Sequence, residues 1–154
     1  GATMVKNLRN HIDFMGQFLD DTNRLLTQLL KDMRASYNIS KEQEEVIMIL
    51  HNEEALTLSQ ITERQGVNKA AVSRRIKKLI QAGLVRWEQS EEHTDQRYKY
   101  ITLTDKGNEY SEKSRNVISD IVGQLLSDLD GEEIDLALTV LEKIDKRLKH
   151  YLNN

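Results

Sequence analysis

Apolar residues in the first quarter of the chain recur at steps of three and four positions, the spacing of one face of an α-helix. Between residues 5 and 37 this stripe comprises Leu8, Ile12, Met15, Leu19, Leu26, Leu29, Leu30 and Met33. The pattern predicts one helix from about Val5 to Tyr37, and a helix this long needs another long helix against its apolar face. Either the C-terminal region or a second copy of the chain supplies that cover.

Two S/T-x-x-Q motifs follow, Ser40 to Gln43 and Thr57 to Gln60. In such a capping box the hydroxyl accepts a hydrogen bond from the first helical turn, and the Gln side chain accepts one from the backbone of the hydroxyl residue. Each motif therefore predicts the start of a helix, the first of which runs through Leu50.

The next boundary signals are glycines and an asparagine. Gly66 suits the left-handed conformation that ends a helix, and Asn68 is a favoured N-cap for a helix from Lys69 to about Ala82, with Gly83 after it. Two helices joined by a short turn that contains Gly are the signature of a helix-turn-helix.

After residue 83 the apolar residues no longer follow the helical spacing of three and four positions. LVRWEQ and RYKYITLT are rich in β-branched and aromatic residues with partial alternation, and the polar stretch SEEHTDQ separates them. This pattern predicts a β-hairpin, and a hairpin directly after a helix-turn-helix is the wing of a winged helix.

Two further helices are expected. Thr104 should cap one from Asp105 to about Leu129, and Asp130 with Glu133 should form a capping box for the last, which ends near Leu152. The predicted fold is mainly α with a small β-hairpin wing (α+β). A winged helix-turn-helix DNA-binding domain at 39–104 is inserted between two helical regions, 4–38 and 105–154, which together form the dimerisation region.

Charge is unevenly distributed along the chain, whose formal net charge is −3. The stretch from Lys69 to Trp87 contains no Asp or Glu and six cations, which are Lys69, Arg74, Arg75, Lys77, Lys78 and Arg86. A solvated helix face usually mixes both signs, so this segregation favours a polyanionic partner over an ordinary surface.

On a helical wheel, one side of the 69–82 helix is apolar, with Val72, Ile76, Leu79 and Ile80. The other side is small and basic, and the predicted DNA contacts there are Asn68, Lys69, Ala70, Ser73, Arg74, Lys77 and Lys78. Ala70 and Ser73 permit close approach to base edges in a major groove, and Arg74 can donate two hydrogen bonds to guanine. Lys77 and Lys78 can neutralise phosphates.

The hairpin tip contributes a further prediction. Arg97 can reach into a narrow minor groove, where the negative potential is strongest. Phosphate repels Asp95, so this carboxylate needs a local partner, and Arg75 or Arg97 could brace the wing in that way.

The segment from LTLSQ to LTDKG (residues 56–107) resembles the winged-helix core of the MarR family of transcriptional regulators. The shared features are the Ser73-Arg74 pair, Gly83-Leu84-Val85, Asp95-x-Arg97 and Leu103-Thr104-Asp105-x-Gly107. GVNKAAVSRR and TDQR are most similar to the TcaR-like branch of that family. The resemblance implies a homodimer whose terminal helices intertwine and which represses at a pseudo-palindromic operator. It also implies release by small phenolic or antibiotic-like anions, and so a role in antibiotic response.

Thr22 is a polar residue in the apolar stripe of the first helix, and Asn23 lies beside it. Polar groups in an apolar interface need partners. The simpler interpretation is a hydrogen bond that specifies the dimer, and the alternative is contact with the small aromatic anion.

Other classes of protein find little support. GxSxG and P-loop motifs are absent, so no enzyme and no cofactor is expected. The chain has no Cys, and its four His residues lie far apart, so no metal site is expected either. No apolar run is long enough to cross a bilayer and no signal peptide is seen, which predicts a cytoplasmic protein without membrane contact. The remaining alternative is a winged helix used for protein–protein contact, which would not need a face free of carboxylates.

Overall fold

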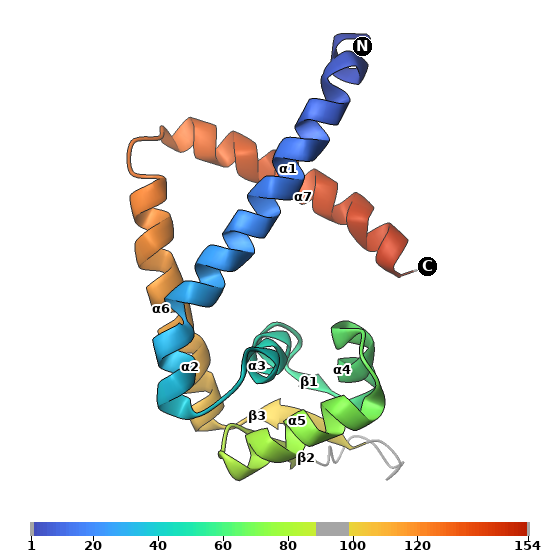
Figure 1. Cartoon of the computed structure of the whole chain (residues 1–154), viewed down its shortest axis with the longest axis vertical. Helices are drawn as coiled ribbons and strands as arrows, with labels where there is room; N and C mark the ends of the chain where they lie inside the picture. The colour runs from blue at the N-terminus through green and yellow to red at the C-terminus, as the bar shows by residue number, and fades with distance from the viewer. Residues whose placement is uncertain (1, 89–98, 154) are drawn as a thin grey trace. The chain divides into compact units, whose positions relative to one another are not determined.

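The computed structural model describes residues 2–88 and 99–153 (Figure 1). The chain forms two compact units, Gly1–Ile118 and Ser119–Asn154. Most of the secondary structure is helical, as predicted.

The predicted single N-terminal helix is wrong, because the structure has two helices, α1 (Ala2–Leu29) and α2 (Lys31–Tyr37). Leu30 separates them with φ −95° and ψ 1°. Beyond this break, the guanidinium of Arg34 donates to the backbone oxygen of Thr27 at 2.6 Å. The apolar residues keep their helical spacing through Leu30, so the sequence pattern could not reveal the break.

The next three helices begin where predicted: α3 (Lys41–Glu53), α4 (Leu58–Gln65) and α5 (Lys69–Gln81). Helix α3 extends three residues beyond the predicted end at Leu50. Both capping boxes are present, at Ser40 and at Thr57, with both reciprocal hydrogen bonds in each. Asn68 caps α5 by accepting from the Ala71 amide at 2.8 Å. Helices α4 and α5 thus form a helix-turn-helix, and Gly66 lies in its turn with φ +67°.

The wing strands are β2 (Val85–Glu88) and β3 (Tyr100–Leu103), which pair antiparallel with Val85 opposite Leu103. A third strand that the sequence did not predict, β1 (Ala55–Leu56), pairs with the other side of β3. The sheet order is therefore β1-β3-β2. In Figure 1, α3, α4 and α5 gather beside these strands.

The core lies where α3, α4, α5 and the sheet meet. Its fully buried members are Val46, Ile47, Leu50, Ile61, Val72, Ile76, Leu79, Leu84, Val85, Ile101 and Tyr110. Burying a side chain of this size stabilises a fold by about 1.5–3 kcal/mol. This core holds α5 with its opposite face outward.

A charged group lies beside this core. Glu44 on α3 is 7% exposed, and its carboxylate accepts from Arg34 at 2.9 Å and from the hydroxyl of Tyr110. The ring of Tyr37 meets that of Tyr110 edge-on, with 4.8 Å between centroids. Together these residues join α2, α3 and the next helix, α6.

Helix α6 spans Asp105–Leu125, and α7 spans Gly131–Leu152. Thr104 caps α6 as predicted, because its hydroxyl accepts from the Gly107 amide at 3.1 Å. Helix α6 ends before the predicted Leu129. The capping box predicted at Asp130 and Glu133 is wrong, because the Asp130 side chain makes no cap hydrogen bond. Asp130 is exposed, so water can solvate its carboxylate instead.

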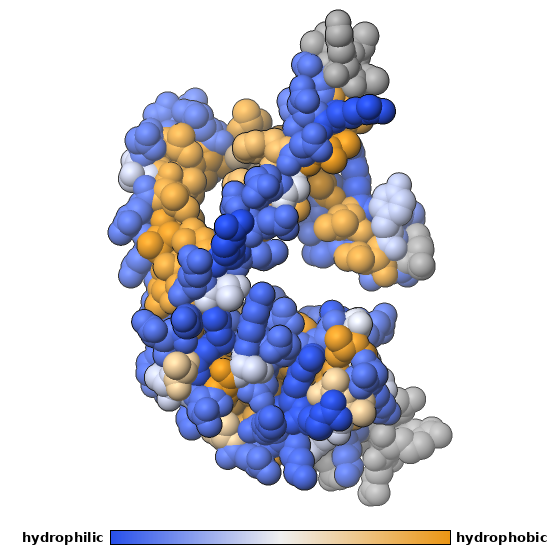
Figure 2. All heavy atoms as spheres, in the orientation of Figure 1, coloured by the Kyte–Doolittle hydropathy of each residue, from blue (hydrophilic) through white to orange (hydrophobic). Residues whose placement is uncertain are grey.

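The second unit has no buried side chain among its described residues, 119–153. The exposed apolar residues of α7 are Leu136, Leu138, Val140, Leu141, Ile144, Leu148, Tyr151 and Leu152. Figure 2 shows such hydrophobic side chains at the surface of α7 and of the end of α6. Among the described residues, no helix combines the length and apolar character needed to cross a bilayer.

We expect Tyr110→Phe to lower the free energy of unfolding by about 1.5–3 kcal/mol at pH 7, because Glu44 loses a charge-assisted hydrogen bond. Burial and the bond to Glu44 raise the pKa of Tyr110 above its usual value near 10. The stability that Tyr110 contributes is therefore complete below about pH 10 and is lost as the pH rises further. Urea unfolding from pH 7 to 11 should thus show a steeper alkaline loss in the wild type than in Tyr110→Phe. Tyr151→Phe, at an exposed position, should match the wild type, and parallel curves for all three proteins would contradict this role.

Candidate nucleic-acid interface

Helix α5 has the orientation predicted from its apolar side. Val72 and Leu79 are fully buried, Ile76 is 2% exposed, and Ile80 is half-buried against the same core. Because three turns of the helix are held in this way, the opposite face is presented to solvent in a fixed rotation.

The predicted contact residues of α5 lie together on that outward face. All of them are exposed, namely Asn68, Lys69, Ala70, Ser73, Arg74, Lys77 and Lys78. The side-chain oxygen of Asn68 is occupied by the cap, so only its NH₂ group is left to donate to a ligand. Asp95 and Arg97 of the predicted wing tip lie outside the described residues.

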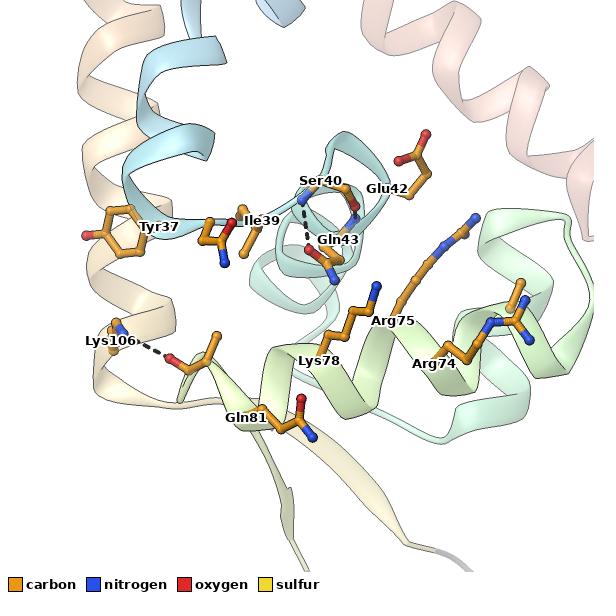
Figure 3. A pocket seen from close by; sticks show the side chains of 13 residues that line it. Tyr37, Ile39, Ser40, Glu42, Gln43, Arg74, Arg75, Lys78, Gln81 and Lys106 are labelled. Atoms are coloured by element: carbon orange, nitrogen blue, oxygen red, sulfur yellow. Dashed lines mark hydrogen bonds between the residues drawn. The ribbon is translucent and has the colours of Figure 1, made fainter.

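A groove of about 940 Å³ runs along one flank of α5, between this helix and the α2–α3 turn (Figure 3). Four cations line it, Arg74, Arg75, Lys78 and Lys106, against the single carboxylate of Glu42. We call it the basic groove; its other lining residues are Tyr37, Asn38, Ile39, Ser40, Gln43, Ala71, Gln81 and Ala82.

Sequence reasoning missed the α2–α3 side of the groove and Lys106. The mixed charges around residue 106 and the mostly polar residues 37–43 gave no signal, because only the tertiary fold brings these segments beside α5. Lys106 lies within the LTDKG motif, which is a feature shared with the MarR family but was not predicted as a contact site.

Arg75 is held on the wall of this groove. Its guanidinium donates to the side-chain oxygen of Gln65 on α4 at 2.8 Å, and Gln65 in turn donates to the backbone oxygen of Glu42 at 3.1 Å. Arg75 thereby links the two helices of the helix-turn-helix. Its bracing of Asp95 stays a prediction.

The other flank of α5 differs in character. A smaller hollow of about 390 Å³ lies between α5 and β2, lined by Leu58, Ser73, Ile76, Lys77, Ile80, Gln81 and Trp87. Among these residues Lys77 is the one cation, and Trp87 is 45% exposed. The described part of the interface is therefore strongly basic on one side of α5 and largely apolar on the other.

These dimensions suit double-stranded DNA. The major groove is about 12 Å wide and admits one α-helix, so a phosphate backbone passes along each flank of that helix. The outward residues of α5 would then face base edges, while Arg75 and Lys78 on the wall of the basic groove would lie beside one phosphate backbone.

The predicted ligand pair of α1 is divided by the structure. Asn23 lines a pocket of about 570 Å³ that α1, α3, α4 and α6 enclose within the first unit, together with Leu26, Thr27, Leu30, Met48, Ile49, Ile118 and several polar residues. Thr22 is not in this pocket, and its hydroxyl donates to the Phe18 backbone oxygen at 2.7 Å. Thr22 therefore already has a partner in its own helix.

The polar residues of this pocket are mostly paired. Arg64 forms three hydrogen bonds with Glu53, the shortest at 2.8 Å, and this contact lowers the pKa of the Glu53 carboxyl. Glu44 is bonded to Arg34 and Tyr110. In the described residues, no group of three or more acidic or His side chains lies close enough together to hold a metal ion.

A helix-turn-helix followed by antiparallel wing strands, with a basic outward helix free of carboxylates, defines a winged-helix DNA-binding protein. A model of the MarR family matches residues 39–97. The HTH-type transcriptional regulator TcaR of Staphylococcus aureus (strain Newman) is 49% identical over 151 residues, covering 98% of this chain and 99% of TcaR. The chain therefore belongs to the MarR family, whose matched relatives are transcriptional regulators and not enzymes.

Solved structures agree on the fold. A MarR family protein from Bacillus stearothermophilus aligns with a TM-score of 0.74 at 18% identity, over 92% of this chain and 97% of that one. The structure of NadR in complex with 4-hydroxyphenylacetate aligns with a TM-score of 0.64 at 18% identity, over 84% of this chain and 91% of NadR. The resemblance drawn from the residues, including its TcaR-like branch, is thus confirmed, and the protein is a DNA-binding transcriptional regulator.

We expect Arg74→Ala and Lys78→Ala to impair DNA binding in different ways. Arg74→Ala should weaken binding to a duplex selected from a random pool by about 1–3 kcal/mol and relax preference at one base pair. Lys78→Ala should weaken binding to the selected duplex and to a scrambled duplex by the same factor. It should also lower the slope of log affinity against log salt by about one unit. Lys113→Ala, an exposed cation on α6 outside the basic groove, is the control for lost charge. Equal loss on both duplexes for Arg74→Ala would mean that Arg74 touches only phosphate.

Proposed function

We propose that the protein is a homodimeric repressor that binds a pseudo-palindromic operator and is released by a small phenolic or antibiotic-like anion. The observation that carries the proposal is the outward face of α5, which is exposed, basic and free of carboxylates. As a regulator of transcription it acts where the DNA is, in the cytoplasm. A winged helix used for protein–protein contact would bind DNA without a steep salt dependence, so the salt slope separates the two functions.

Exposed apolar surface supports the two-fold assembly. On α1, six apolar side chains are each at least 43% exposed: Leu8, Ile12, Phe14, Met15, Phe18 and Leu19. On α7 the apolar stripe extends over 22 residues, about 33 Å at 1.5 Å per residue. Soluble monomers rarely expose apolar patches of this extent. A second copy of the chain has matching stripes and would bury both helices.

A two-fold dimer also fits the way α5 would read DNA. Two α5 helices about 34 Å apart, one turn of the duplex, enter successive major grooves on one side. The symmetry of the protein then imposes a palindromic operator. A ligand that changes this spacing prevents both helices from entering grooves together, which is the mechanism of release that we propose.

We expect Leu141→Asp to abolish dimerisation and DNA binding together. The lost apolar burial alone, about 2–3 kcal/mol, weakens association roughly 100-fold, and the buried charge adds to this. Thr139→Asp adds the same charge to the same helix at a position outside the apolar stripe, and should leave both properties intact. Sedimentation equilibrium and duplex titration measure the two effects. A folded wild-type monomer that binds the selected duplex at micromolar concentration would refute the two-fold model.

The pocket lined by Asn23 is the proposed site of the anion. It combines apolar walls with the cations Lys41 and Arg64 and the carboxylates Glu44 and Glu45, of which Glu44 is already bonded to Arg34 and Tyr110. NadR supplies a phenolic acid as a probe. We expect 4-hydroxyphenylacetate to release the selected duplex, and Asn23→Ala to raise the concentration required roughly fivefold to tenfold through one lost hydrogen bond. Thr22→Val, which alters a hydroxyl outside the pocket, should not change it. Equal effects of the two variants would place the ligand elsewhere.

A further inference from the structure

The chain leaves α5 through a turn whose backbone oxygens are all held by one neighbouring segment. The Nζ of Lys106 donates to the Ala82 oxygen at 2.9 Å, and the hydroxyl of Thr104 donates to the Gly83 oxygen at 2.5 Å. The amide of Thr104 donates to the Leu84 oxygen at 3.1 Å. Ala82, Gly83 and Leu84 follow the last residue of α5, so no amide of the helix is available to their oxygens, and the residues that begin α6 supply the donors instead.

The same segment approaches the turn too closely for a side chain at one position. A Cβ on Gly107 would lie 2.2 Å from the Leu84 oxygen and 3.1 Å from a methyl carbon of Leu103. Real Cβ atoms do not approach backbone oxygen so closely, so an alanine here would push the turn and α6 apart. The contact between the start of α6 and the end of α5 thus depends on glycine.

Lys106 is itself held from its other side. Its Nζ lies 6.0 Å from the centre of the Tyr37 ring, which is within cation–π range, and Tyr37 packs on Tyr110. Figure 3 shows Lys106 at one end of the basic groove, bonded to the backbone beside Gln81. One turn further along α6, Tyr110 is bonded to Glu44 of α3. The first two turns of α6 are therefore attached to α3 and to the exit of α5.

We propose that Lys106, with Thr104 and Gly107, is a positioning residue that sets where the C-terminal end of α5 lies for operator recognition. This inference rests on the proposed reading of DNA by α5. Base readout tolerates displacements of only about 0.5 Å, so a helix end released from its anchor loses specific contacts first. Non-specific attraction to phosphate depends on charge at longer range and is retained.

A direct phosphate contact is the competing role for Lys106, because an ammonium group has three donors and only one is used on Ala82. The two roles differ in salt dependence. A cation that neutralises a phosphate contributes about 0.9 to the slope of log affinity against log salt, whereas a positioning residue contributes none on non-specific DNA.

The test compares Lys106→Met, Lys106→Arg and Lys113→Met in the full chain. Lys113 is a matched control, because it also lies on α6 and over the Tyr37 ring, at 5.7 Å, and pairs with Glu109 instead of bonding to the α5 exit. The DNA probes are a duplex that the wild type selects from a random pool and a scrambled duplex of the same composition. Amide hydrogen exchange at Ala82, Gly83 and Leu84 reports on the turn without DNA.

We expect Lys106→Met to speed exchange at these three amides roughly fivefold to tenfold, the effect of one hydrogen bond. Affinity for the selected duplex should fall by a similar factor, with affinity and salt slope on the scrambled duplex unchanged. Lys106→Arg should restore both properties, and Lys113→Met should leave both as in the wild type.

Two results would overturn the inference. A salt slope lowered by about one unit on both duplexes would make Lys106 a phosphate contact. Unchanged exchange at Ala82–Leu84 would show that Lys106 does not hold the turn. Failure of the wild type to select any duplex would instead refute DNA readout by α5, and the exchange measurement separates that failure from the other two.

Discussion

A carboxylate buried in the first unit is the constraint on which the arrangement of its helices depends. An unpaired charge inside a protein costs several kcal/mol, so Glu44 requires donors on both oxygens. Arg34 provides one from α2, ten residues before Glu44, and Tyr110 provides the other from α6, 66 residues after it. The same guanidinium reaches Thr27 across the break at Leu30. Glu44, on the first helix of the winged domain, thus binds both α2, which precedes this domain in the chain, and α6, which follows it.

Features that arise within one or two helical turns could be predicted from the sequence. The Ser40 and Thr57 capping boxes depend on side chains three residues apart, and the rotation of α5 follows from its apolar period. The break at Leu30 and the two-residue strand β1 were missed, because neither changes the local pattern. At Asp130 the motif was present but the hydrogen bond was not, since an exposed carboxylate has water as an alternative partner.

In the candidate site, too, the features within one helix could be predicted and those that depend on tertiary contacts could not. Arg74, Lys77 and their neighbours are consecutive on one helix face, so their common exposure could be predicted. Lys106 reaches the groove only because α6 packs on the exit of α5, a contact that no local pattern encodes. The Thr22 and Asn23 pair was separated for a related reason: adjacent residues on a helix point about 100° apart, and only one of them faces the pocket.

The single tryptophan of the chain, Trp87, lies on β2 in the apolar hollow beside α5 and keeps nearly half of its surface open to solvent. Indole emission shifts with the polarity of its surroundings, and no second indole contributes to the signal. The protein therefore carries an intrinsic optical reporter at one flank of the candidate interface. Its spectrum would register an arriving duplex or a repacked wing without a dye attached to the surface under study.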